Sequence, residues 1–173
     1  MLKLKPVLFI LLSSIITACA LGDVSNATPP PPITLAPPPA LNLVGTCDET
    51  KTLENWLQVT SELRASFQTQ MNATAAKSKA EMYADVLELA ALRDSSFEVA
   101  TPDCAAETGI KLSDAMSQTV TAFQMYVNGD TPDLGNTIAD MNGQIDQIAA
   151  MQNDLIDRMN TQFQQQREAT TAP

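Results

Sequence analysis

The sequence predicts an all-α fold: an antiparallel up-down-up-down four-helix bundle that follows a signal peptide and a proline-rich linker. Two observations carry this prediction. Every long apolar pattern after residue 46 has helical rather than strand spacing, and four segments open with signals typical of helix N-termini. The roughly 125 residues involved are enough for one domain with its own hydrophobic core.

The chain begins with the features of a secretory signal. Lys3 and Lys5 precede an apolar run from Val7 to Ile16, and that run closes at Ile16-Thr17-Ala18-Cys19. A transmembrane anchor is the alternative, but about ten apolar residues fall well short of the roughly 20 that span a bilayer as a helix. We therefore predict a signal peptide over residues 1–18.

The end of this signal resembles the lipobox of bacterial lipoproteins, with Ile16 where leucine is commonest. The resemblance implies cleavage just before Cys19, diacylation of its thiol and acylation of the new amino group by fatty acids such as palmitate. Several acyl chains hold a protein on its membrane, because one chain alone gives only marginal binding. We expect a lipid-anchored, extracytoplasmic protein of the bacterial cell envelope, on the cell membrane or the outer membrane.

The charge of the mature chain is strongly negative. Lys3 and Lys5 leave with the signal, so 8 basic residues face 20 acidic ones, a net charge of −12. Phosphate backbones and anionic headgroups would repel such a chain, which argues against nucleic-acid binding and against electrostatic docking on lipid. A solvated, soluble exterior explains the acidity better than a cation-binding surface does.

Residues 19–45 are predicted to form the lipidated cysteine and a disordered tether. Pro29–Pro32 and Pro37–Pro39 lie among small and polar residues, a composition that favours extended polyproline II structure with little to bury. The steps from Cys19 to Cys47 would reach about 60–90 Å if fairly stiff.

Residues 46–168 are predicted to form the bundle, and 169–173 a disordered tail. Four apolar stripes have helical spacing, and the last alternates steps of four and three like a heptad seam. The stripes are Leu53, Trp56, Leu57, Thr60, Leu63, Phe67 and Met71; Tyr83, Val86, Leu87, Ala90 and Phe97; Leu112, Met116, Val120, Phe123 and Val127; and Leu134, Ile138, Met141, Ile145, Ile148, Gln152, Leu155 and Met159.

Helix boundaries follow from capping signals. Thr46 with Glu49 and Ser78 with Glu81 have the spacing of capping boxes. The other two helices are each expected to begin with an N-cap threonine followed by proline and aspartate, and the third is expected to end at a glycine C-cap. These signals are Thr101-Pro102-Asp103, Thr131-Pro132-Asp133 and Asn128-Gly129.

The boundary between the first two helices is weak, since neither glycine nor proline occurs between Asp48 and Ala100. In an exported protein Cys47 and Cys104 are expected to pair, although two free buried thiols are an alternative. A single helix of some 50 residues would carry the two cysteines far apart, so we predict a break between Asn72 and Lys77.

The sequence argues against an enzyme and predicts no catalytic, cofactor-binding or metal-binding residues. It contains no histidine, which excludes Ser-His-Asp triads and imidazole metal sites, and it has no nucleotide-binding fingerprint. Glu81, Asp85 and Glu88 share a helix face, and the expected interpretation is a solvated acidic surface. The oxygen-rich segment 128–133 lacks the spacing of an EF-hand loop and is expected to be a turn.

The last helix is predicted from Pro132 to about Arg167, long enough to extend beyond its neighbours. A polar seam residue such as Gln152 often fixes register or oligomeric state. The overhang is either a frayed, glutamine-rich end or a partner face formed by Leu155, Met159 and Phe163.

The region 45–165 also resembles an uncharacterised type of bacterial exported helical domain, through Pro102-Asp-Cys104 and Gly129-Asp130. The resemblance implies no activity. We expect a non-enzymatic binding or scaffolding module with an envelope protein as partner, exposed apolar candidates being Val59, Leu92, Met125 and Ile156. The alternative is a carrier of a small molecule or metal ion, which would need a cavity among the helices.

Overall fold

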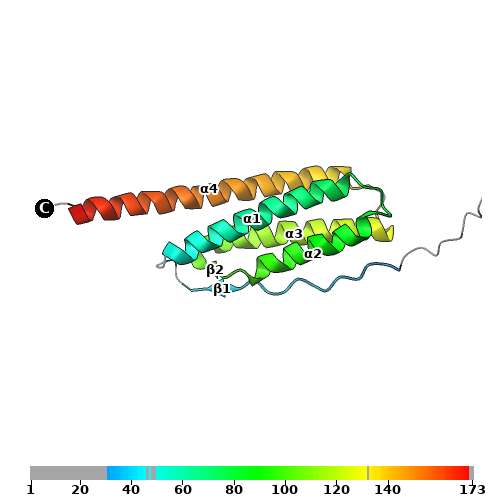
Figure 1. The fold of residues 1–173 in the computed structure, drawn as a ribbon, viewed down its shortest axis with the longest axis horizontal. Coiled ribbons are helices and arrows are strands. Elements are labelled where there is room, and N and C mark those ends of the chain that lie inside the picture. The colour runs from blue at the N-terminus through cyan, green and yellow to red at the C-terminus, as the bar shows by residue number, and fades with distance from the viewer. Residues whose placement is uncertain (1–30, 46, 48–49, 132, 172–173) are drawn as a thin grey trace, which may run out of the picture. The chain divides into compact units, whose positions relative to one another are not determined.

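The computed structural model describes residues 31–45, 47, 50–131 and 133–171. The predicted signal peptide, Cys19 and the Thr46–Glu49 capping box lie outside these residues. The elements of the described part, in chain order, are β1 (Leu43–Val44), α1 (Thr50–Ala75), α2 (Met82–Glu98), β2 (Thr101–Pro102), the 3₁₀ helix η1 (Asp103–Ala105), α3 (Ala106–Asn128) and α4 (Gly135–Thr171). The protein is therefore mainly helical, as predicted (Figure 1).

Each of the four helices packs against two others. α1 lies against α2 and α4, and α3 lies against the same two helices. The predicted stripes form the interior, with one correction: Leu87 is exposed and Leu89 is fully buried in its place. Val86, Leu89, Ala90 and Phe97 share one face of α2 because three or four residues complete a turn, whereas Leu87 is turned about 100° from Val86.

The buried side chains form two clusters. The larger cluster includes Phe67, Met71, Val86, Leu89, Met116, Val120, Phe123, Ile145 and Ile148. The smaller cluster consists of Trp56, Leu57, Ala105 and Leu155, with Leu53, Val99, Ile156 and Met159 packed against it. A polar group on α1 and α4, Thr60, Arg64 and Gln152, lies between the two clusters along these helices.

The break between the first two helices is confirmed, since α1 ends at Ala75 and α2 begins at Met82. In the connection, the N–H and the hydroxyl of Ser78 both donate to Glu81 Oε2, at 3.1 and 2.5 Å. These hydrogen bonds lower the pKa of Glu81 below its ordinary value. They are one half of the predicted capping box, and α2 itself begins after Glu81.

The prediction that Thr101 caps the third helix is wrong. Thr101 and Pro102 form β2, which pairs in parallel with Leu43 and Val44 of β1, and α3 begins only at Ala106 after the η1 turn. The hydroxyl of Thr101 accepts a hydrogen bond from Trp56 Nε1, so it is not free to cap a helix.

The fourth helix was expected to begin at Pro132, which lies outside the described residues, but α4 begins only at Gly135. Asp133 Oδ1 accepts from the N–H of Gly135 at 2.8 Å, so Asp133 lies before the helix and bonds its first residue. The C-cap of α3 is confirmed: Gly129 has a φ of +92°, and its N–H and that of Asp130 bond carbonyls of the last turn. Glycine adopts this left-handed conformation without steric cost.

Residues 32–45, which we call the extended segment, lie against the helices where the sequence predicted a tether. Ile33 is buried in the larger cluster and Leu35 packs against it. Figure 1 shows this segment running beneath α2 and α3 toward β1. The end of α4 also differs from the prediction. The helix continues to Thr171, into the residues 169–173 that were expected to form a disordered tail.

Candidate functional site

The candidate site lies around the disulfide between Cys47 and Cys104, whose Cα atoms are 5.8 Å apart. The N–H of Cys104 also donates to Cys47 Sγ at 2.9 Å. The bond agrees with the predicted pairing and joins Cys47, three positions before the first residue of α1, to η1. We call this part of the domain, together with β1 and β2, the disulfide end.

A largely buried group of hydrogen-bonded residues, Trp56, Val99 and Thr101, stabilises the disulfide end. Trp56 Nε1 donates to Thr101 Oγ1 at 3.1 Å, and that hydroxyl donates to the carbonyl of Val99 at 3.2 Å. Thr101 is fully buried, and its methyl group faces Gly109 so closely that a Cβ atom there would lie 2.8 Å from it. Gly109 lies inside α3, where glycine ordinarily weakens a helix, and it is needed here for this close approach.

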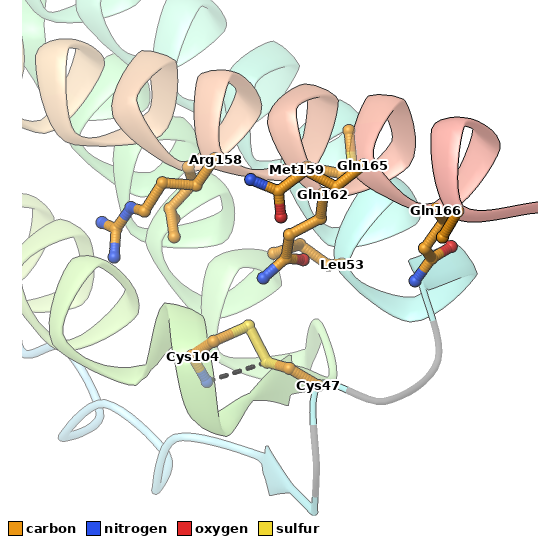
Figure 2. Close-up of a pocket in the computed structure, with 10 residues that line it drawn as sticks. Cys47, Leu53, Cys104, Arg158, Met159, Gln162, Gln165 and Gln166 are labelled. Atoms are coloured by element: carbon orange, nitrogen blue, oxygen red, sulfur yellow. Dashed lines mark hydrogen bonds between the residues drawn. A yellow bond between two sulfur atoms is a disulfide. The ribbon is translucent and has the colours of Figure 1, made fainter. Parts of the chain in front are cut away.

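A groove of about 640 Å³ lies beside the disulfide. It is enclosed by the disulfide, Leu53 of α1 and the C-terminal part of α4, as Figure 2 shows. Most of its lining side chains are at least partly exposed, so the groove lies at the surface. The lining residues are Cys47, Leu53, Cys104, Leu155, Arg158, Met159, Gln162, Gln165, Gln166 and Ala169.

The groove combines an apolar lining with side-chain amides. The disulfide, Leu53, Leu155 and Met159 form the apolar part of its lining, and the amides are those of Gln162, Gln165 and Gln166 on α4. Arg158 is paired with Asp154 on the same helix. Amides offer both donors and acceptors, so such a surface could bond a peptide backbone beside an apolar contact.

The three residues of the predicted partner face differ in their exposure to solvent. Leu155 is 3% exposed within the smaller cluster, and Met159 packs against that cluster. Phe163 is 42% exposed and lies in a shallow hollow with Gln166, Arg167 and Thr170. Because every described side chain from Asn160 to Thr170 is exposed, the accessible part of α4 begins after Met159.

The side-chain amide of Gln152 forms its hydrogen bonds with residues of the same chain. It is 1% exposed, its amide nitrogen donates to Thr60 Oγ1 at 3.0 Å, and its oxygen accepts from Arg64 Nε at 2.8 Å. Buried amides are costly unless paired, so these bonds fix the register of α4 against α1. The sequence indicated a register role and left open whether the partner lay in the same chain.

Of the four residues expected to form an exposed apolar patch, only Met125 is exposed. Leu92 and Ile156 pack against the two clusters, Val59 is half-buried, and Met125 is exposed. A single exposed side chain is not the contiguous apolar patch that a partner-binding surface requires.

The acidic triplet also separates. Asp85 is buried, and its Oδ2 lies 2.5 Å from Lys77 Nζ in the α1–α2 connection. This contact raises the pKa of Lys77 above its ordinary value. Glu81 and Glu88 are exposed and bond Ser78 and Gln70. The expectation of a solvated triplet is thus wrong for Asp85, whose role is an ion pair beneath the connection.

No group of three or more metal-ligating side chains occurs within the residues that the structure describes. Across the same residues, no helix is long and apolar enough to span a membrane. Searches against known protein families, characterised proteins and solved structures find no match to this chain.

Proposed function

We propose that the protein is a bacterial envelope lipoprotein, anchored through lipid on Cys19, whose helical domain binds or scaffolds another envelope protein. The Ile16–Cys19 pattern carries the anchor part of this proposal. A disulfide between Cys47 and Cys104 supports export, because such bonds persist in oxidising compartments.

The domain is proposed to be an antiparallel up-down-up-down bundle. Side-chain hydrogen bonds between α1 and α4 support this arrangement, because Asn72 bonds Asn142, Gln68 bonds Asp146 and Thr60 bonds Gln152. Partner numbers rise in α4 as they fall in α1, which is the register of two helices that run in opposite directions. The short connection between α1 and α2 favours the same topology.

The binding role rests on the accessible part of α4 and the groove beside it. α4 continues about three turns beyond Met159, and its described side chains there are exposed, so this part of the helix offers an accessible face to a partner. Phe163 supplies the exposed aromatic side chain that protein interfaces often use as an anchor. No observation among the described residues favours the carrier alternative, since the groove lies at the surface.

The anchor is tested with Cys19→Ala in the native envelope. The exported variant should no longer partition into detergent, because nothing else in the mature chain is expected to hold it on lipid. Unchanged membrane fractionation, without aggregation, would refute the lipoprotein proposal.

The binding role is tested by cross-linking in intact envelopes with the full chain and a chain truncated after Asn160. A cross-linked partner that depends on residues 161–173 and on Phe163, but not on exposed Met125, would support a specific interface. Identical cross-links from both chains would show that the end of α4 binds nothing.

A further inference from the structure

The extended segment determines where the chain leaves the helical domain. Ile33 is 3% exposed, its N–H donates to Asn128 Oδ1 at 2.8 Å, and its carbonyl accepts from Asn128 Nδ2 and Gln124 Nε2, both at 3.0 Å. A residue with a buried apolar side chain and both backbone groups bonded is held firmly. Residue 33 is therefore fixed at the C-terminal end of α3.

We call this the Gly129 end of the domain. It contains the C-cap of α3 and the α1–α2 connection, because Lys79 of that connection lies over the ring of Tyr126, 5.6 Å from its centroid.

The other end of the extended segment is fixed at the disulfide end. The N–H of Asn42 donates to the carbonyl of Phe97, the carbonyl of Asn42 accepts from Thr101, and β1 pairs with β2. Ten residues at about 3.1 Å each cover about 31 Å between Ile33 and Leu43. The 23 residues of α3 rise about 34 Å, so the segment follows that helix for almost its whole length.

Buried Arg93 holds the middle of the segment. Its guanidinium donates to the carbonyl of Ala36 at 3.2 Å and is paired with Asp94 at 2.7 Å. An arginine this buried requires such partners, so the carbonyl of Ala36 is part of what keeps Arg93 stable in place.

From this path we infer that the Gly129 end faces the membrane, while the disulfide end, with its groove and the accessible part of α4, faces away. The inference rests on the proposed anchor at Cys19. If the chain left the domain at Cys47, the disulfide end would be nearest the anchor. Because the chain leaves the domain at Ile33 instead, the Gly129 end is nearest the anchor. Only 14 residue steps separate Cys19 from Ile33, and they can span at most about 50 Å.

The orientation explains how the groove reaches a partner. α4 is about 55 Å long, and its C-terminal part lies at the disulfide end, so it projects away from the lipid surface. The net charge of −12 in the mature chain disfavours a domain lying flat on anionic headgroups. A partner is therefore expected on a layer of the envelope that faces this membrane, not within the membrane itself.

The test uses the chain from residue 19 to 173, in which Cys19 carries the single free thiol once Cys47 and Cys104 have paired. The thiol is coupled to a maleimide lipid in vesicles with an acceptor dye at the bilayer surface. A donor amino acid is placed at exposed Ala80, at the Gly129 end, or at exposed Gln164, near the groove. Energy transfer should be several-fold greater from position 80; equal transfer, or greater transfer from position 164, would overturn the inference.

A matched pair of variants tests the role of the extended segment. Ile33→Asp places a charge in the core and should detach the segment, which should bring the two transfer efficiencies together. Thr34→Asp adds the same charge at the exposed neighbour and should leave the difference intact. An undiminished difference in a folded Ile33→Asp chain would show that the segment does not set orientation.

The two possible failures are distinguishable. The lipid is attached chemically in this experiment, so its outcome does not depend on lipidation in the cell. The anchor itself is judged separately, by the fractionation of Cys19→Ala. The comparison of positions 80 and 164 also stands by itself if Ile33→Asp does not fold.

Discussion

The close approach of Thr101 to α3 predicts that one substitution has opposite effects at two helical glycines. Gly109→Ala should destabilise the protein, whereas Gly143→Ala should stabilise it. Intrinsic helix propensity alone favours alanine by about 1 kcal/mol at both positions. The structure separates them, because a Cβ at Gly143 would meet nothing within 4 Å, while one at Gly109 would lie 2.8 Å from Thr101 Cγ2 and 3.6 Å from Trp56 Cζ2.

The magnitude follows from how little Thr101 can move. Its side chain is fully buried and branched at Cβ, and its hydroxyl is bonded to both Trp56 and Val99, so rotation of the methyl group would break hydrogen bonds. Overpacking of this kind costs about 1–3 kcal/mol, which exceeds the gain in propensity. We expect Gly109→Ala to be less stable than Gly143→Ala by about 1–3 kcal/mol.

Urea unfolding of both variants measures this difference, and a thermal scan should separate them by about 3–5 °C for each kcal/mol. Thr101→Ser removes Cγ2 and keeps the hydroxyl, so Gly109→Ala should cease to be destabilising in that background. If Gly109→Ala raises the free energy of unfolding as much as Gly143→Ala does, the close approach of β2 to α3 is incorrect.

Three further predictions concern other parts of the fold. Replacing both Cys47 and Cys104 by alanine should lower the free energy of unfolding by up to about 4 kcal/mol, since the bond closes a loop of 57 residues; two alkylatable thiols in the native protein would contradict the pairing. Because Ser78 lowers the pKa of Glu81, the contribution of Glu81 to stability is complete above its ordinary value of 4.5 and is lost as the pH falls through the lower folded-state pKa. The melting temperatures of wild type and Glu81→Ala should therefore differ at pH 7 and converge at acid pH, and a constant gap would disprove this linkage. Truncation after Asn160 should leave the melting temperature unchanged, whereas truncation after Gln152 should lower it by removing buried Leu155; equal melting of the two would show that α4 packs differently.

Local patterns were sufficient for much of this fold. The spacing of apolar residues along the chain defined four helices and most of their buried faces, because helical periodicity reports burial directly. Gly129 marked the end of α3, since few other residues adopt a positive φ. The expected pairing of Cys47 with Cys104 required a break between the first two helices, and α1 does end at Ala75.

Other positions depended on contacts that no local pattern reports. Thr101 has the sequence context of an N-cap. Its hydroxyl nevertheless accepts a hydrogen bond from Trp56, 45 residues away, and its backbone pairs with β1. Asp85 looked like part of a solvated surface until the α1–α2 connection brought Lys77 over it. Gln152 marked a polar seam position, but only the packing of α4 on α1 shows that Thr60 and Arg64 bond it.

The sequence by itself determined the class of fold and the four helices after residue 46, because helical periodicity is a local property of the chain. It also favoured the pairing of Cys47 with Cys104 over two free thiols. Only the tertiary structure decided the course of residues 32–45. Proline-rich composition predicts an extended backbone, but it does not indicate whether that backbone packs against or bonds other parts of the chain. Arg93, Gln124 and Asn128 supply those partners from distant parts of the chain. Burial of Ile33 and these hydrogen bonds therefore hold an extended conformation that the sequence predicts equally well for a free tether.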